Sequence, residues 1–198
     1  MKLYNLDLSG NCYKVRLFAA LTGIPLDLIP VNLAEREQKT AAFTVLNPFE
    51  EVPVLVDGDV TLRDSQAILV YLAGRHADRS WRPDDALSQA RIMEWLSVAA
   101  GEVRNGPNTA RLIHKFGYDL DMAEALRWTN RLLPLLEAHL ATQDWFALGH
   151  PTIADCALFP YLALAPEGGI DLSPYPALLR WIDRVSALPG FVSMPGIS

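Results

Sequence analysis

The sequence predicts a mixed α/β domain followed by an all-helical domain. In the first third of the 198 residues, short apolar runs alternate with turn residues, a pattern typical of alternating strands and helices. Beyond a polar stretch that contains Arg82-Pro83, apolar residues recur every three or four positions, which is the period of amphipathic helices. We therefore expect residues 1–76 to form the first domain, residues 77–85 a linker and residues 86–198 an all-α domain.

The first domain should contain a β-α-β unit, then a β-hairpin and a second helix. The first helix is expected to stop at Thr22-Gly23-Ile24-Pro25, because glycine and proline commonly end helices. In the run PVLVDGDVTL, Asp57-Gly58 separates two apolar stretches, which is a strong hairpin signal. The expected strands are residues 2–6 and 26–31, the expected helices are residues 13–21 and 66–76, and the expected hairpin is residues 53–62.

In the second domain, two apolar patterns predict long helices. We expect Asn105-Gly106-Pro107 to break the first helix, and a further helix to begin after His150-Pro151. Pro134 lies inside the second pattern, so that helix should either kink or have its boundary there. The inward positions are Ile92, Leu96, Ala99 and Val103 in the first helix, and Met122, Leu126, Thr129, Leu133, Leu136 and Leu140 in the second.

The string Thr152-Ile153-Ala154-Asp155 has the spacing of a capping box, in which two side chains satisfy free N–H groups at a helix start. We expect its role to be structural, and replacing either end of it should reduce stability by about 1 kcal/mol. Cys156 follows directly and is expected to be a small buried apolar residue.

Composition excludes several classes of function. The formal net charge of −6 argues against a protein that binds nucleic acid or an anionic membrane. No apolar run reaches the roughly 20 residues that a membrane helix needs. Cys12 and Cys156 form neither a CxxC pair nor a disulfide framework, which favours the reducing cytoplasm. The four histidines are scattered, so we expect no metal site.

The stretch LSGNCYK, residues 8–14, lies where the first strand should give way to the first helix. Taken alone, it has three interpretations. Cys12 could belong to a thiol-redox site, Ser9 could act on the thiol of another molecule, or Ser9 could simply cap the helix.

Two further positions also have a structural and a functional interpretation. A cis bond at Val52-Pro53 would turn the Val52 backbone toward an extended ligand. Because only about 5–6% of X-Pro bonds are cis, spacing alone favours an ordinary trans proline at an edge strand. Asp64-Ser65 begins a helix whose free N–H groups suit a ligand carboxylate, and Asp64 suits an ammonium, but a plain N-cap is the commoner role.

Four strings along the chain carry a resemblance to a known family. They are KLYNLDLSGNCYKVRLFAA, LNPFEEVPVLVDGDVTLRDSQAILVYL, HPTIADCALFPYL and PYPALLRWIDRVSALPGF. In this order they resemble the cytosolic glutathione S-transferase superfamily, with Ser9-Gly10-Asn11 similar to the active-site turn of theta-, zeta- and nu-like members. The resemblance implies a thioredoxin-like N-terminal domain that holds glutathione as co-substrate, an all-α domain that shapes the second substrate's pocket, and a homodimer.

The resemblance implies that Ser9 is catalytic and that Asn11 also approaches the sulfur, whereas Cys12 falls past the nucleophile position. The Ser9 hydroxyl would donate a hydrogen bond that favours the thiolate of glutathione. Lowering a thiol pKa by about 2 units requires roughly 2.7 kcal/mol. A hydrogen bond to a charged acceptor supplies about 1.5–3 kcal/mol and a helix N-terminus about 0.3–1 kcal/mol, so the two together suffice.

The resemblance also maps the glutathione-binding residues. It implies that the Val52-Pro53 bond is cis and that the valine backbone pairs with the cysteinyl unit. The acid-serine pair Asp64-Ser65 would grip the γ-glutamyl end, and either Gln38 or Lys39 would reach the glycine carboxylate. Glu51 stands where relatives often have Gln or Lys, so it either points away from the ligand or weakens binding.

We therefore expect a glutathione transferase that acts on a small electrophile. A glutathione-dependent disulfide or peroxide reductase and a non-catalytic binding or regulatory protein remain alternatives. A zeta-like isomerase is less favoured, because Ser9-Gly10-Asn11 replaces the Ser-Ser-Cys of that group. Arg111 suits an anionic substrate, although an arginine on a solvated helix surface is the simpler interpretation. The candidates for the second substrate's pocket are Trp95, Asn105, Asn108 and Arg111.

Overall fold

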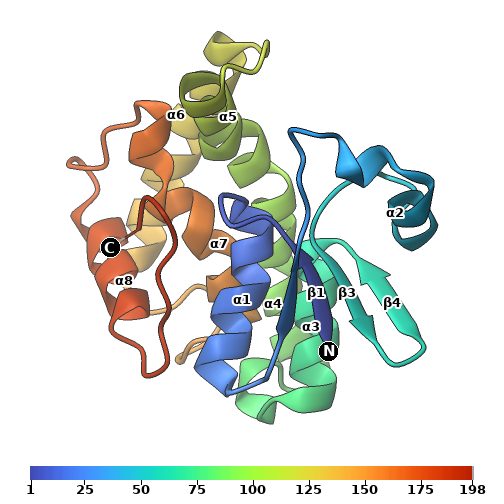
Figure 1. The fold of residues 1–198 in the computed structure, drawn as a ribbon. Coiled ribbons are helices and arrows are strands. Elements are labelled where there is room, and N and C mark those ends of the chain that lie inside the picture. The colour runs from blue at the N-terminus through green and yellow to red at the C-terminus, as the bar shows by residue number, and fades with distance from the viewer. Residues whose placement is uncertain (198) are drawn as a thin grey trace.

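The computed structural model describes residues 1–197 and has the α/β unit and the helical unit that the sequence predicts (Figure 1). The α/β unit is built on a four-stranded sheet with strand order β2-β1-β3-β4. Strands β1 and β2 are parallel, and β3 is antiparallel to both β1 and β4. The strands are β1 (Lys2–Asn5), β2 (Asp27–Pro30), β3 (Val54–Asp57) and β4 (Val60–Arg63).

Helices cover both faces of this sheet, because successive residues of a strand point to opposite sides. Leu3 of β1 and Leu55 of β3 are paired in register and belong to the main core, beneath α1 and α3. Tyr4 faces the other way and meets Phe43 of α2 edge-on, with ring centroids 5.9 Å apart. These helices are α1 (Gly10–Thr22), α2 (Ala41–Leu46) and α3 (Ser65–His76), with a 3₁₀ turn, η1 (Glu37–Lys39), before α2.

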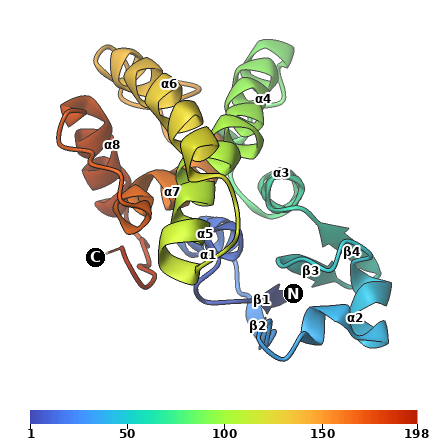
Figure 2. The ribbon, with the colours of Figure 1, turned by 90° about the horizontal axis from the view of Figure 1, so that it is seen from above.

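The helical unit is arranged around α7, in which every residue from Ile153 to Leu162 is buried. Figure 2 shows α7 beside α1, with α4, α6 and α8 around it. A helix that is apolar on all sides belongs in the centre of a core. The elements are η2 (Arg79–Trp81), α4 (Ala86–Ala100), η3 (Arg104–Asn108), α5 (Thr109–Phe116), α6 (Met122–Leu140), α7 (Ile153–Ala163), η4 (Ala165–Gly168) and α8 (Pro176–Ser186).

The expected break at residues 105–107 is wrong. Helix α4 already ends at Ala100, and residues 104–108 form a wide π-helical turn, η3, that continues directly into α5. Pro107 lies inside this helical segment, and the wide π-helical turn accommodates a residue that has no N–H to donate. Gly106 is required there, because a Cβ would lie 2.9 Å from Oγ1 of Thr129 on α6.

Helix α6 runs through Pro134 from Met122 to Leu140, so its boundary does not fall at the proline. Thr129 and Leu133 are buried as expected, but Leu126 is 37% exposed. Among residues 1–197, no helix is both long and apolar enough to cross a lipid bilayer.

The capping box at the start of α7 is confirmed and does more than cap. The N–H of Thr152 donates to the Asp155 carboxylate at 2.9 Å, and the Thr152 hydroxyl accepts from Ala154 at 3.2 Å. The buried Asp155 also accepts from the Phe146 N–H at 3.2 Å and from Nε1 of Trp181 at 3.0 Å. Asp155 therefore joins the start of α7 to α8 and to the loop before α7.

We predict that the two ends of the capping box differ in their contribution to stability. Thr152→Ala should lower the free energy of unfolding by about 1 kcal/mol, the value of an N-cap. Asp155→Ala should lower it by about 3 kcal/mol or more, because it leaves three buried N–H groups without an acceptor. Urea denaturation measures both changes, and Asp121→Ala, which removes the exposed N-cap of α6, is the matched control. Equal losses for Thr152→Ala and Asp155→Ala, or a loss for Asp155→Ala no greater than that for Asp121→Ala, would contradict the prediction.

Candidate active site

A cavity of about 630 Å³ lies between the α/β unit and the helical unit. One wall comes from the first turns of α1 and α3 and from the segment before β3. The other wall comes from the end of α4, from η3 and α5, and from α7. The polar and charged residues that line the cavity, together with Val52, include Ser9, Asn11, Lys14, Gln38, Glu51, Asp64, Gln66, Arg104, Asn108, Arg111 and Tyr161.

Ser9 caps α1 and also faces the cavity. Its Oγ accepts a hydrogen bond of 3.3 Å from the backbone N–H of Cys12. Capping uses a lone pair of the hydroxyl and leaves its O–H as a donor. No oxygen or nitrogen atom within residues 1–197 accepts that O–H, and the neighbouring sulfur of Cys12, which the hydroxyl reaches, is only a weak acceptor. Ser9 can therefore cap the helix and still turn its O–H toward a stronger acceptor in the cavity.

Asn11 occupies the first turn of α1 and connects three elements. Its backbone N–H donates to the hydroxyl of Tyr161 on α7 at 3.2 Å. Its side-chain oxygen lies 3.5 Å from the hydroxyl of Ser65, which also lies 2.7 Å from the side-chain oxygen of Gln66. Ser65 is buried behind the wall, and Gln66 takes its place at the cavity surface.

Asp64 lines the cavity and caps α3. Its carboxylate accepts from the backbone N–H groups of Gln66 at 2.9 Å and Ala67 at 3.0 Å. Both oxygen contacts are made by Oδ1, so Oδ2 remains available to a cation. The structural and the functional interpretation of Asp64 are therefore compatible.

The Val52-Pro53 bond is cis, as the family resemblance implies, so the preference for trans drawn from spacing alone is wrong. Val52 lines the cavity while Pro53 is buried at the start of β3. Within the described part of the chain, neither the N–H nor the C=O of Val52 pairs with another backbone group. A short backbone edge is thus open toward the cavity.

The two candidates for the glycine carboxylate are separated by the structure. Gln38 lines the cavity, and its side-chain oxygen is buried with no hydrogen-bond partner within residues 1–197. Lys39 is outside the wall and lies 3.8 Å from the carboxylate of Glu50. Glu51 does line the cavity, with an exposed side chain, while its backbone oxygen accepts from Asn47 at 2.7 Å.

Arg111 is buried, which overturns the interpretation of it as a solvated surface residue. It is 2% exposed, and its Nε donates to the Glu167 carboxylate at 2.6 Å. Its Nη1 donates to the backbone oxygen of Leu8 at 3.1 Å, immediately before Ser9. The helical unit therefore holds the turn that carries Ser9 through a charged hydrogen bond.

The other candidates for the second substrate's pocket do not lie together in the cavity wall. Asn108 is buried in the cavity wall, but Asn105 is exposed and outside it. Trp95 belongs to a separate hollow, where its ring lies 4.7 Å from that of His139.

Cys12 is a packed residue of the first turn, as expected. It is fully buried and absent from the cavity wall, and its Sγ accepts from the Leu6 N–H at 3.4 Å. Burial raises the pKa of this thiol, although hydrogen bonds from the Leu6 N–H and the Ser9 side chain oppose the change. A buried thiol with a raised pKa is a poor nucleophile, which argues against a redox site at Cys12.

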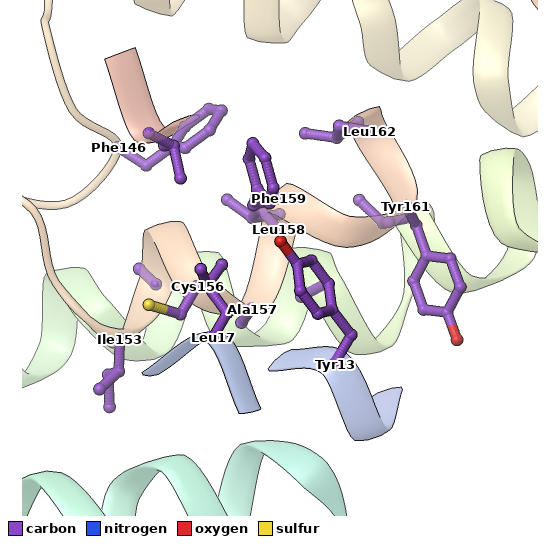
Figure 3. Packing of buried hydrophobic residues seen from close by; sticks show 14 of the residues in the cluster. Tyr13, Leu17, Phe146, Ile153, Cys156, Ala157, Leu158, Phe159, Tyr161 and Leu162 are labelled. Atoms are coloured by element: carbon purple, nitrogen blue, oxygen red, sulfur yellow. The ribbon is translucent and has the colours of Figure 1, made fainter. Parts of the chain in front are cut away.

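Two residues in the wall escaped sequence reasoning. Tyr161 packs its ring against Gly10, where a Cβ would lie 2.6 Å from its Cε1 atom. Figure 3 shows Tyr161 at the end of the buried cluster, with its hydroxyl directed away from Leu158 and Phe159. Lys14 is 1% exposed and places its Nζ 5.3 Å from the centre of the Tyr161 ring. For Lys14 the sequence did contain a signal: Asn11 and Lys14 are three positions apart, so they lie on one face of the helix.

Family models match both halves of the chain. Residues 3–80 match the glutathione S-transferase N-terminal domain, and residues 109–189 match the C-terminal domain of the same family. The chain belongs to the glutathione S-transferase family. Within residues 1–197, this transferase has no group of three His, Cys, Asp or Glu side chains suited to a metal ion.

Relatives of this glutathione S-transferase come from plants, animals and bacteria. A zeta-class glutathione S-transferase of Euphorbia esula is 30% identical and matches 96% of this chain and 88% of its own length. The maleylacetoacetate isomerase of Pseudomonas aeruginosa is also 30% identical, over 96% of this chain and 93% of its own.

Solved structures agree with the fold. A glutathione S-transferase of Xanthobacter autotrophicus is 33% identical, with a TM-score of 0.90 over 98% of this chain and 97% of its own. A glutathione transferase homologue of Drosophila mojavensis, solved with bound glutathione, is 31% identical, with a TM-score of 0.86 over 95% of this chain and 88% of its own.

We predict that Gly10→Ala destabilises the transferase by about 1–3 kcal/mol, the range for overpacking a tight contact. The new methyl group would meet the Tyr161 ring, so either the ring or the start of α1 must move. Gly74→Ala is the matched control, because this exposed position in α3 has no closer neighbour than Nη1 of Arg82 at 3.7 Å. The control should be stabilised by about 0.5–1 kcal/mol. Urea denaturation compares the two, and a Gly10→Ala protein as stable as wild type would show that the contact is loose.

Proposed function

We propose that this protein is a glutathione transferase that uses Ser9 to stabilise the glutathione thiolate for attack on a small electrophile. One observation carries the proposal. The Ser9 hydroxyl faces the cavity at the N-terminus of α1, and within residues 1–197 its O–H has no oxygen or nitrogen acceptor, only the weak acceptor sulfur of Cys12. A hydrogen bond from Ser9 and the field of the helix N-terminus both favour a negative charge at this point.

We assign the other contacts of glutathione from the residues that line the cavity. In this proposal the cysteinyl backbone of glutathione pairs with the open edge at Val52. The γ-glutamyl end reaches Asp64 and the side chain of Gln66, because Ser65 is buried behind the cavity wall. The glycine carboxylate meets the side-chain amide of Gln38 rather than Lys39, because only Gln38 lines the cavity. Glu51 lies near the same end, and its negative charge weakens binding of that carboxylate.

A second candidate function is glutathione-dependent isomerisation of an unsaturated dicarboxylate. It is supported by the similarity to the maleylacetoacetate isomerase of Pseudomonas aeruginosa and by arginines in the helical wall. Nη2 of Arg111 is buried without a partner among the described residues, and Arg104 is exposed at the same wall. The turn Ser9-Gly10-Asn11 still departs from the Ser-Ser-Cys pattern of zeta members. We place the protein in the cytoplasm as a homodimer by family resemblance alone.

The test is a turnover panel with glutathione. The second substrates are an aryl halide, a hydroperoxide, a small disulfide and a cis-unsaturated dicarboxylate, which separate transferase, reductase and isomerase activity. Removing the Ser9 hydroxyl should lower kcat/KM by about 10–100-fold, the equivalent of one hydrogen bond to a charged acceptor. Ser9→Gly is the best variant, because glycine replaces a serine N-cap at a loss of only a few tenths of a kcal/mol.

Two controls accompany this panel. Cys12→Ser should retain most of the activity, since Cys12 is outside the cavity wall, and Ser9→Thr should retain it because a hydroxyl remains. Activity that survives Ser9→Gly but falls in Asn11→Ala would transfer the donor role to Asn11. If no substrate turns over and calorimetry detects no glutathione binding, the protein is a binding or regulatory member of the family.

A further inference from the structure

Lys14 is a cation buried at the cavity without a carboxylate partner. It is 1% exposed, it lines the cavity, and within residues 1–197 no acidic side chain forms an ion pair with it. Lysine is rarely buried unless it is paired, because removing an ammonium from water is costly. A buried ammonium at a ligand cavity therefore indicates that the ligand brings the matching negative charge.

The position of the Lys14 ammonium follows from three contacts. Its Nζ lies 5.3 Å from the centre of the Tyr161 ring. That ring packs on Gly10, and its hydroxyl accepts the N–H of Asn11. Since Lys14 follows Asn11 by three positions and helical side chains lean toward the N-terminus, the ammonium is directed to the first turn of α1. Ser9 caps this same turn.

The charged groups that face Lys14 compensate its charge only in part. Asp64, at the start of α3, is the nearby acid, but its carboxylate caps that helix and forms no ion pair with Lys14. Arg104 in η3 repels it. Tyr161 on α7 contributes a neutral ring, since burial raises the pKa of its hydroxyl. Burial lowers the pKa of Lys14 to about 8, so the side chain is still mostly charged at neutral pH.

We propose that Lys14 is a second catalytic residue, whose ammonium faces the sulfur of bound glutathione and stabilises the thiolate together with Ser9. This inference rests on the function proposed above. In the step concerned, the S–H bond breaks, its electron pair stays on sulfur, and the proton leaves to bulk water. Lys14 keeps its proton throughout, and the thiolate beside it strengthens its hold on that proton.

The test is the thiol pKa of bound glutathione, read from the ultraviolet absorbance of the thiolate as pH is varied. Lys14→Met, which keeps the length and the apolar stem, should raise this pKa by about one unit or more, a tenfold loss of thiolate at a pH below both values. Lys14→Arg should retain much of the effect. Lys14→Gln provides the same readout should the methionine variant fail to fold, and Lys2→Met, at an exposed strand position, is the matched control.

Binding of S-methylglutathione, which has no thiol, separates the sulfur from the carboxylates of the ligand. Lys14→Met should leave the Kd of S-methylglutathione unchanged. An equal loss of affinity for both ligands would overturn the proposal, because Lys14 would then contact a carboxylate. An unchanged thiol pKa in Lys14→Met would also overturn it, whereas a wild-type protein that does not bind glutathione would overturn the proposed function itself.

The stability of the ligand-free variants gives a further readout. A lysine with a purely structural role would make Lys14→Met less stable than wild type at neutral pH. A lysine kept for its charge should give a variant that melts at the same or a higher temperature, because the buried ammonium opposes folding. Thermal denaturation of the ligand-free proteins distinguishes the two, and a clear fall in Tm together with an unchanged thiol pKa of bound glutathione would assign Lys14 a structural role and overturn the proposal.

Discussion

The site depends on the packing of α1 against α7. Tyr13 and Leu17 of α1 lie beside Cys156, Leu158 and Phe159 of α7 in one buried cluster (Figure 3). Because this core is continuous from the sheet to the helical unit, the two halves share a single hydrophobic interior rather than a hinge. The start of α1 is thereby fixed in front of the cavity, where hydrogen bonds from Arg111 to the Leu8 carbonyl and from the Asn11 N–H to Tyr161 hold its first turn.

Ser9 and Asp64 each use one hydrogen-bonding site to cap a helix and leave another free to face the cavity. Ser9 accepts a hydrogen bond from the helix it caps and retains its O–H. Asp64 uses one oxygen for the N-terminus of α3 and leaves the other open. A side chain that is held by one bond loses little further rotational entropy when it binds a ligand, so these caps also pre-organise the site.

Local features of the fold and the site were predictable from the sequence, and long-range ones were not. The hairpin at Asp57-Gly58 and the capping box at Thr152 depend on neighbouring residues, so their signals are contained in short strings. The burial of Arg111 and the position of Tyr161 depend on contacts with residues 103 and 150 positions away. The cis bond at Val52-Pro53 required the family resemblance, since spacing alone favoured trans.

The contacts of Arg111 limit how the two halves of the sequence can diverge in evolution. Its guanidinium spans Glu167 in η4 and the Leu8 carbonyl, so three distant segments depend on one side chain. A chimera that combined this α/β unit with the helices of another family member would lose the support of the turn that carries Ser9 unless the new helices supplied the same arginine and acid. The two halves of the gene are therefore constrained to evolve together at this point, even where the surfaces around them diverge.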